Sequence, residues 1–161
     1  MAVHRLTLDL PLEDDYELIA IHSSMEAYKL AFLLNKNLGL RFYRKKDVGL
    51  LFHGNNADFQ LYEYEDTYHY SSYYLLKNKT NIATTLASGV QDLFTTTQDK
   101  DTIQYAIPEL KKVDYFLKVE TETDHSISIS MLSKLKGIDQ IIAAYAVEYD
   151  TLKSKNNLIF E

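Results

Sequence analysis

The densest group of metal-ligand side chains lies at residues 120–125. Carboxylates at Glu120, Glu122 and Asp124 alternate with threonines, and His125 follows directly. On a strand the three carboxylates would share one face and, with the imidazole, offer ligands to a hard or borderline metal ion. The alternative is a solvated strand end leading into a helix cap. We favour that alternative because no second cluster has metal-ligand spacing, and we expect neither a metal site nor a cofactor.

Recognisable catalytic motifs are missing. The five histidines form no His-x-His or His-Glu-x-x-His pattern, and Ser88-Gly89 lacks the flanking residues of a nucleophile elbow. No glycine-rich loop resembles a phosphate-binding motif. A Ser, His and Asp brought together from separate loops would escape this test. The motifs thus predict no catalytic residue and favour a non-enzymatic protein, while an enzyme of another type stays open.

Tyrosines are concentrated in one predicted hairpin, which holds six of the 13. Tyr62 and Tyr64 would share one strand face, as would Tyr68 and Tyr70, so the hairpin would carry an aromatic platform. Cross-strand packing, a protein–protein surface and stacking of RNA bases are the three interpretations. Acidic residues in the same hairpin oppose phosphate. We therefore place cross-strand packing first, a protein–protein surface second and base stacking last, and we keep the four tyrosines as a candidate protein-binding surface.

Basic side chains gather at two places. Arg41 and Arg44 stand among aromatic residues, and Lys153 and Lys155 lie close to the C-terminus. Either pair could bind an anion, RNA or an acidic partner, although such clusters are more often solvated surface. The apolar residues 158–160 that follow are expected to dock on the core.

Composition limits the remaining function classes. The 161 residues suit one domain over 1–161, and no Pro/Gly/Ser-rich linker divides them. Lys and Arg number 17 against 23 Asp and Glu, and this net charge of −6 argues against DNA and anionic membranes and disfavours RNA. The absence of Cys excludes disulfides and thiolate metal sites. Without a signal-peptide pattern or an apolar run of ~20 residues, we expect a soluble, cytoplasmic protein.

Hydrophobic periodicity predicts two strand–helix–strand units. In the first, Ser23 and Glu26 form a capping-box signature, and Gly39 ends the helix. Both units open with the same pattern, Asp15-Tyr16-Glu17-Leu18 and Asp114-Tyr115-Phe116-Leu117, which suggests a duplicated half-fold, with coincidence as the alternative. We predict strands at 6–10, 16–21, 40–44, 59–64, 68–76, 113–119 and 141–147, helices at 27–38, 82–94 and 127–135 (capped by Asp124 or Ser126, ended by Gly137), a turn at 65–67 and a loop at 95–101.

Residues 107–115 read Ile-Pro-Glu-Leu-Lys-Lys-Val-Asp-Tyr. This run resembles the motif that names the IPExxxVDY family, found chiefly in Bacteroidetes bacteria. The resemblance implies no activity or cofactor, but genes of that family often lie near those for ribonuclease III and pyruvate kinase, an RNA-linked association. Physically, the proline suits the start of a helical turn with the glutamate near its positive end; paired catalytic carboxylates are the alternative. We expect structural roles for Ile107, Pro108, Glu109, Val113, Asp114 and Tyr115.

Together these patterns predict an α+β fold, with a mainly antiparallel sheet and two principal helices packed on one face. The sheet and helices could be arranged as two related strand–helix–strand halves, each ferredoxin-like or ACT-like. Residues 123–126 lack the glycine-rich loop of ACT ligand sites, which disfavours ligand binding by that route. The expected function is a non-enzymatic protein–protein interaction or regulatory module, with a protein partner or self-association as a homodimer. The alternative is a small-molecule, anion or RNA-linked binding module that uses a basic patch.

Overall fold

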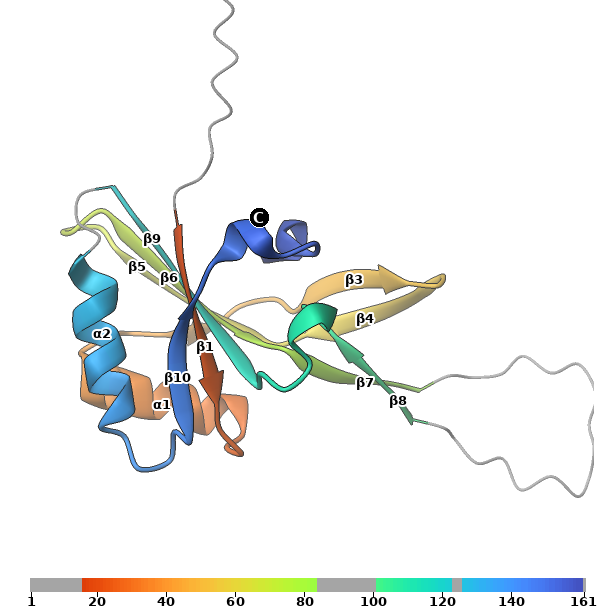
Figure 1. Cartoon of the computed structure of the whole chain (residues 1–161), viewed down its shortest axis with the longest axis horizontal. Helices are drawn as coiled ribbons and strands as arrows, with labels where there is room; N and C mark the ends of the chain where they lie inside the picture. Colours follow the sequence, from red (N-terminus) through yellow and green to blue (C-terminus); the bar gives the residue numbers. More distant parts are fainter. Residues whose placement is uncertain (1–15, 84–100, 123–125, 161) are drawn as a thin grey trace, which may run out of the picture.

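The computed structural model describes residues 16–83, 101–122 and 126–160. These residues form a six-stranded sheet, two α-helices, two separate hairpins and three short 3-10 helices (Figure 1). In chain order the elements are β1 (Tyr16–His22), α1 (Ala27–Leu38), β2 (Tyr43–Arg44), β3 (Val48–Phe52), β4 (Asn55–Phe59), β5 (Leu61–Asp66), β6 (Ser71–Lys77), β7 (Lys79–Ala83), β8 (Asp101–Tyr105), η1 (Pro108–Leu110), β9 (Tyr115–Thr121), α2 (Ser126–Lys136), β10 (Ala143–Val147), η2 (Tyr149–Thr151) and η3 (Lys155–Leu158).

The central sheet has the strand order β10-β1-β9-β6-β5-β2, and all neighbouring strands are antiparallel. The hairpins β3–β4 and β7–β8 form separate two-stranded sheets. In the middle of the large sheet, Ala20 of β1 lies opposite Phe116 of β9, and Leu117 lies opposite Leu75 of β6. The expected α+β class with an antiparallel sheet is confirmed.

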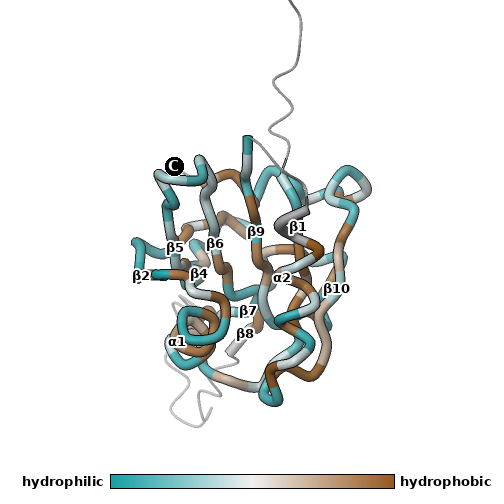
Figure 2. The backbone as a smooth tube through the Cα atoms, turned by 90° about the vertical axis from the view of Figure 1, so that its left-hand side faces the viewer, coloured by the Kyte–Doolittle hydropathy of each residue, from teal (hydrophilic) through white to brown (hydrophobic). Residues whose placement is uncertain are grey.

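Each face of the sheet carries its own core, because alternate residues of a strand point to opposite sides. On one side Ile19 and Leu117 pack with buried residues of α1 and α2. On the other side Leu18 and Phe116 pack with β4, the end of η1 and the C-terminal segment. Figure 1 shows the helices on one side and the hairpins on the other, and Figure 2 shows apolar residues on the central strands and helices. Burial on both faces explains why β1 and β9 read as continuous apolar runs.

Helix α1 has the predicted bounds but not the predicted cap. Glu26 occupies the N-cap position without a side-chain cap hydrogen bond. Ser23 instead donates its hydroxyl to the Gln140 carbonyl at 2.9 Å and accepts the Met25 N–H at 3.3 Å, so the capping box is wrong. At the other end Gly39 has a φ of 69°, a conformation that residues with side chains rarely adopt, and it ends the helix as expected.

The tyrosine-rich hairpin turns later than predicted. β5 ends at Asp66 and β6 begins at Ser71, so the turn covers 67–70 rather than 65–67. Tyr68 and Tyr70 lie in this turn, and Tyr70 has a φ of 51°. The expectation that these two share a strand face is therefore wrong. The physical reason is that the Asp66 carboxylate accepts backbone N–H groups of the turn and favours it over further pairing.

Three other segments differ from prediction. Within 40–44 only the last two residues form a strand, because the Asn35 side chain occupies the backbone N–H and carbonyl of Phe42. Phe59 ends β4 rather than opening the next strand, and the hairpin β3–β4 was not predicted. Ile82, expected in a helix, lies in β7, where β-branched neighbours favour an extended chain.

The two predicted strand–helix–strand units are placed differently in the sheet. Helix α2 connects β9 and β10, which lie on either side of β1. Helix α1 connects β1 with β2, and three strands separate that pair. β10 lies two places from β9, with β1 between them, and the strand in the corresponding place two positions from β1, with β9 between them, is β6. The strand at 40–44 is thus not the equivalent of β10.

Several predictions lie outside the described residues. These are the strand at 6–10, the helix at 82–94 beyond residue 83, the loop up to residue 100, and the positions of Asp124 and His125. Asp101, at the end of the predicted loop, begins β8. Neither helix in the described ranges is long and apolar enough to cross a membrane.

Candidate functional site

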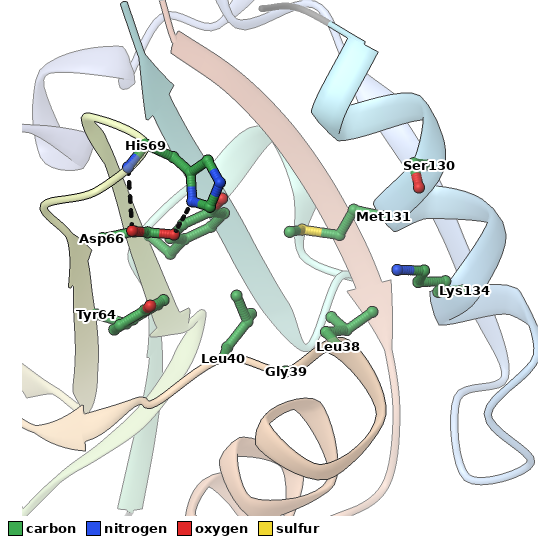
Figure 3. A pocket seen from close by; sticks show the side chains of 10 residues that line it. Leu38, Gly39, Leu40, Tyr64, Asp66, His69, Ser130, Met131 and Lys134 are labelled. Carbon is green, nitrogen blue, oxygen red and sulfur yellow. Dashed lines mark hydrogen bonds and ion pairs between the residues drawn. The ribbon is translucent and has the colours of Figure 1, made fainter.

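An open pocket lies between the β5–β6 turn and the two helices (Figure 3). We call it the turn pocket. Its volume of about 470 Å³ falls within the range of pockets that hold small molecules or side chains. Three parts of the chain line it: Leu38, Gly39 and Leu40 at the end of α1; Tyr64, Asp66, His69 and Tyr73 from the β5–β6 hairpin; and Ser130, Met131 and Lys134 from α2.

The lower wall of the turn pocket is the end of α1. Because Gly39 turns the chain in a left-handed conformation, Leu38 and Leu40 stand on either side of it and point toward the cavity (Figure 3). Leu40 is buried and belongs to the helix-side core. From the opposite side, the Met131 thioether points in from α2 (Figure 3). The end of α1 and Met131 therefore supply the apolar part of the pocket's lining.

An aromatic pair forms the hairpin side of the turn pocket. Tyr64 and Tyr73 are directly opposite in the β5–β6 register, and their rings stack with centroids 5.7 Å apart and planes 14° apart. Tyr73 is only 5% exposed. Burial also raises the pKa of its hydroxyl. Tyr64, which is only partly buried, therefore presents the accessible aromatic surface of the pair.

Asp66 and His69 form a polar edge of the turn pocket. Asp66 Oδ2 lies 2.7 Å from His69 Nδ1, and Oδ1 accepts the backbone N–H groups of Tyr68 at 3.1 Å and of His69 at 3.2 Å. The hydrogen bond from the His69 side chain, more than any other cause, lowers the pKa of Asp66. The carboxylate thereby orients the imidazole, whose second nitrogen, Nε2, is directed away from it (Figure 3).

Helix α2 supplies the other polar groups. The Lys134 ammonium points toward the pocket, and Ser130 lies one turn earlier on the helix (Figure 3). Aromatic and thioether surface with an imidazole and an ammonium nearby suits an apolar or aromatic group that carries a hydrogen-bond acceptor or a negative charge. Among the described residues no hydrogen bond joins Ser130 to His69, so the two do not form a nucleophile–base pair in this structure.

The four predicted tyrosines divide into two kinds. Tyr62 and Tyr64 are partly buried and pack against the helix-side core, as the cross-strand interpretation expects. Tyr68 and Tyr70 are 84% and 67% exposed in the turn. They therefore form no continuous platform: Tyr64 lines the turn pocket, Tyr62 packs against the helix-side core, and Tyr68 and Tyr70 project from the turn.

The four predicted basic residues remain in two pairs. Arg41 is exposed, while Arg44 forms an ion pair with Asp47 and lies over the Tyr62 ring, 5.4 Å from its centroid. Lys153 and Lys155 are exposed in the C-terminal segment. Arg44 belongs to β2 at one edge of the central sheet, whereas Lys153 and Lys155 lie between Leu152 and Leu158, which pack on the hairpin side of the sheet. The two pairs thus belong to different parts of the fold.

The C-terminal residues follow their prediction in part. Leu158 is fully buried, and Phe160 packs against the same core. Ile159 is 60% exposed, so this part of the docking prediction is wrong. The side chains of consecutive residues alternate in direction here: Leu158 and Phe160 face the sheet, so Ile159 between them points outward.

The motif residues 107–115 serve the packing of the fold. Ile107 and Val113 are buried, and Pro108 opens η1 with Glu109 in its first turn, as expected. Tyr115 is buried in the helix-side core and donates its hydroxyl to the Met25 carbonyl at 2.5 Å. This bond fixes the segment that leads into α1.

The two motif carboxylates have separate partners. Asp114 accepts hydrogen bonds from Lys79 Nζ at 3.0 Å and from the Ser23 N–H at 2.9 Å. Glu109 accepts the Ser154 hydroxyl at 2.9 Å. Each carboxylate therefore has a local structural role, and the geometry lends no support to the paired catalytic arrangement.

The acidic group at 120–125 is only partly described. Glu120 lies 2.5 Å from the ammonium of Lys118, which is itself buried. No group of three potential metal ligands occurs in the described ranges. Glu120 thus acts as the counter-charge of a lysine in this structure.

Sequence reasoning did not single out Asp66, His69, Met131 or Lys134. The spacing Asp66-Thr67-Tyr68-His69 is a local signal for a turn in which the aspartate binds following N–H groups. Met131 and Lys134 of α2 have no such local sequence signal, because only the tertiary fold brings this helix to the turn.

No protein-family model matches the chain, and no curated protein matches it.

Proposed function

We propose that the protein is a non-enzymatic interaction module and that a partner protein inserts an apolar or aromatic side chain into the turn pocket. The observation that carries the proposal is the position of the pocket beside exposed aromatic residues. Tyr68 and Tyr70 project from the same turn whose His69 lines the pocket. A small molecule held in the pocket would not need them, whereas a protein surface would contact both.

Burial and hydrogen-bonding capacity support this assignment. Tyrosine combines a large apolar ring with a hydroxyl and is enriched at protein interfaces. Aromatic residues are also enriched among the few side chains that contribute most of the binding energy at such interfaces. The imidazole of His69 can bind a backbone or side-chain acceptor of the partner at the pocket edge.

A matched pair of substitutions on α2 tests the proposal. Ser130 lines the turn pocket, whereas Ser133, exposed on the same helix, does not. Ser130→Tyr should fill the pocket, and Ser133→Tyr adds the same side chain outside it. Affinity purification from a lysate of the source organism should recover a stoichiometric protein with the unmodified chain and with Ser133→Tyr, and lose it with Ser130→Tyr.

The exposed tyrosines give a second readout. The double variant Tyr68→Ser/Tyr70→Ser leaves the pocket-lining residues in place and should also lose the partner. Recovery of the same proteins by all four chains would contradict the proposal. Circular dichroism of each variant separates loss of binding from loss of fold.

A small anionic molecule is the second candidate ligand, favoured by Lys134 on α2 and His69 opposite it (Figure 3). Binding of such a ligand would weaken steeply as salt rises and with Lys134→Ala, whereas an aromatic protein contact would change little. Arg41 and Arg44 lie in a different part of the fold from Lys153 and Lys155, and Arg44 is already paired with Asp47, so these residues add no support for an RNA-linked role.

We further propose membership of the IPExxxVDY family, which rests on the motif at 107–115 and on the close fit of its residues in the structure. A ferredoxin-like arrangement of β10-β1-β9-β6 is part of this proposal. Its support is that β1 and β6 enclose β9, while β9 and β10 enclose β1. The β2–β5 strands and the two hairpins would then be additions to that arrangement. Localisation in the cytoplasm stays a proposal based on composition.

A further inference from the structure

The two edges of the central sheet differ in how they are protected. The β2 edge is only two residues long, and it carries Arg44 with Lys45 next to it. A short, charged edge is a usual device against unwanted strand pairing. The β10 edge has five residues, Ala143–Val147, with no charge and no proline. It thus lacks the protection that the other edge has.

The outer side of β10 is free within the described residues. Its inner side pairs with β1 at all five positions, and no described strand pairs with its outer side. Tyr145 is 41% exposed, and Ile142, just before the strand, is 76% exposed. Unpaired backbone groups flanked by exposed apolar side chains are a ready template for another strand.

We propose that a second copy of this chain pairs with β10 in antiparallel orientation, centred on Tyr145. In a two-fold symmetric pair of identical strands, one residue lies opposite itself. With Tyr145 at that point, Ala143 lies opposite Val147 of the second copy and Ala144 opposite its Ala146. All five residues of each strand are then paired, and the two tyrosine rings meet across the axis.

Charge distribution favours a second copy despite the net charge of −6. No charged side chain occurs in the paired strand. The nearest acidic residue, Glu148, would lie beyond the end of the ladder, roughly 20 Å from its counterpart in the second copy. This separation exceeds the screening length of about 8 Å at physiological salt, so these two carboxylates do not oppose the pairing.

A lysine at the symmetry axis is the first test. Tyr145→Lys removes the aromatic pair and places two ammonium groups opposite each other, so we expect the dimer dissociation constant to rise about tenfold or more. Ile159→Lys, at another exposed apolar position outside β10, should leave it unchanged. Analytical ultracentrifugation of the full chain and both variants measures this. A monomeric unmodified chain, or equal dissociation constants for all three, would overturn the proposal.

A single cysteine is the second test, because the chain has none of its own. Directly opposed residues in an antiparallel pair have Cα atoms about 4.5–5.5 Å apart, which a disulfide can span. Mild oxidation should therefore link Tyr145→Cys chains into covalent dimers and leave Ile159→Cys chains unlinked. The absence of a linked Tyr145→Cys dimer would overturn the register centred on this residue. Ser130→Tyr should not alter either result, so dimerisation and the turn pocket fail or succeed independently.

Discussion

The carboxamide of Asn78 is hydrogen-bonded to the backbone of Ile107 on one side and to two later carbonyls on the other. Its Oδ1 accepts the Ile107 N–H at 2.9 Å, and its Nδ2 donates to the carbonyls of Leu110 at 3.0 Å and Val113 at 2.9 Å. Asn78 is fully buried. One side chain, 29 residues before Ile107, thereby holds both ends of the motif turn.

Replacement of Asn78 by alanine should destabilise the protein severely. Three backbone groups around η1 would lose their partner in a buried site, so we expect the free energy of unfolding to fall by roughly 3 kcal/mol or more. Urea denaturation followed by circular dichroism measures the change. Asn81→Ala, at an exposed position on β7, is the matched control and should have little effect. Similar losses for the two variants would contradict this role of Asn78.

The elements that sequence reasoning located correctly are those with a strong local pattern. Apolar runs marked β1 and β9, and helical spacing marked α1 and α2. The hairpin β3–β4 has a weaker signal: its turn is His53-Gly54, with φ values of 48° and 82°, and glycine at such a position is typical of two-residue hairpins. The turn pocket was harder to predict from the sequence. Tyr64 could be named from the hairpin pattern, whereas Lys134 reaches the turn only through long-range packing. Asn78 has no local motif at all.

Lys118 should anchor the C-terminal segment. It is 4% exposed, its ammonium donates to the Leu158 carbonyl at 2.9 Å, and the Tyr16 and Phe160 ring centroids lie 4.4 Å and 5.3 Å from it. Lys118→Met keeps apolar volume but leaves the carbonyl without its donor and removes the cation–π contacts. We expect a loss of about 1–3 kcal/mol in unfolding free energy.

Hydrogen exchange of residues 152–160 gives a local readout for Lys118→Met. These amides should exchange faster if the lysine holds the segment. Lys112→Met, at an exposed lysine shortly before β9, should change neither stability nor exchange. Unchanged exchange in Lys118→Met would show that packing of Leu158 and Phe160 suffices.

One buried and two partly buried tyrosines predict a loss of stability in alkali. Burial, more than any other cause, raises the pKa of Tyr115 to about 12, and the same holds for Tyr16 and Tyr74. Above pH 10 the unfolded chain loses these protons while the folded chain keeps them, so the free energy of unfolding falls as pH rises from about 10 to 12. Tyr115→Phe should make this decline less steep and cost about 1 kcal/mol at pH 7 through loss of the bond to Met25. Urea titrations from pH 7 to 11 measure both effects, and an unchanged pH slope would count against the assignment.

The lowered pKa of Asp66 predicts a loss of stability in acid rather than in alkali. Its pKa is lowered first by the His69 side chain and is supported by backbone N–H groups of the turn. The folded carboxylate therefore stays ionised at pH values where the unfolded one is protonated, so its stabilising contribution is present above the usual value of 3.8 and disappears as pH falls through the lowered pKa. Asp66→Asn keeps an oxygen for the turn but loses the charge, and it should flatten the acid part of the curve of unfolding free energy against pH.

Asp66→Ala should also loosen the turn and speed amide exchange at Tyr68 and His69, which Asp66→Asn should not. If both variants kept the acid dependence of the unmodified chain, the carboxylate would not be its source.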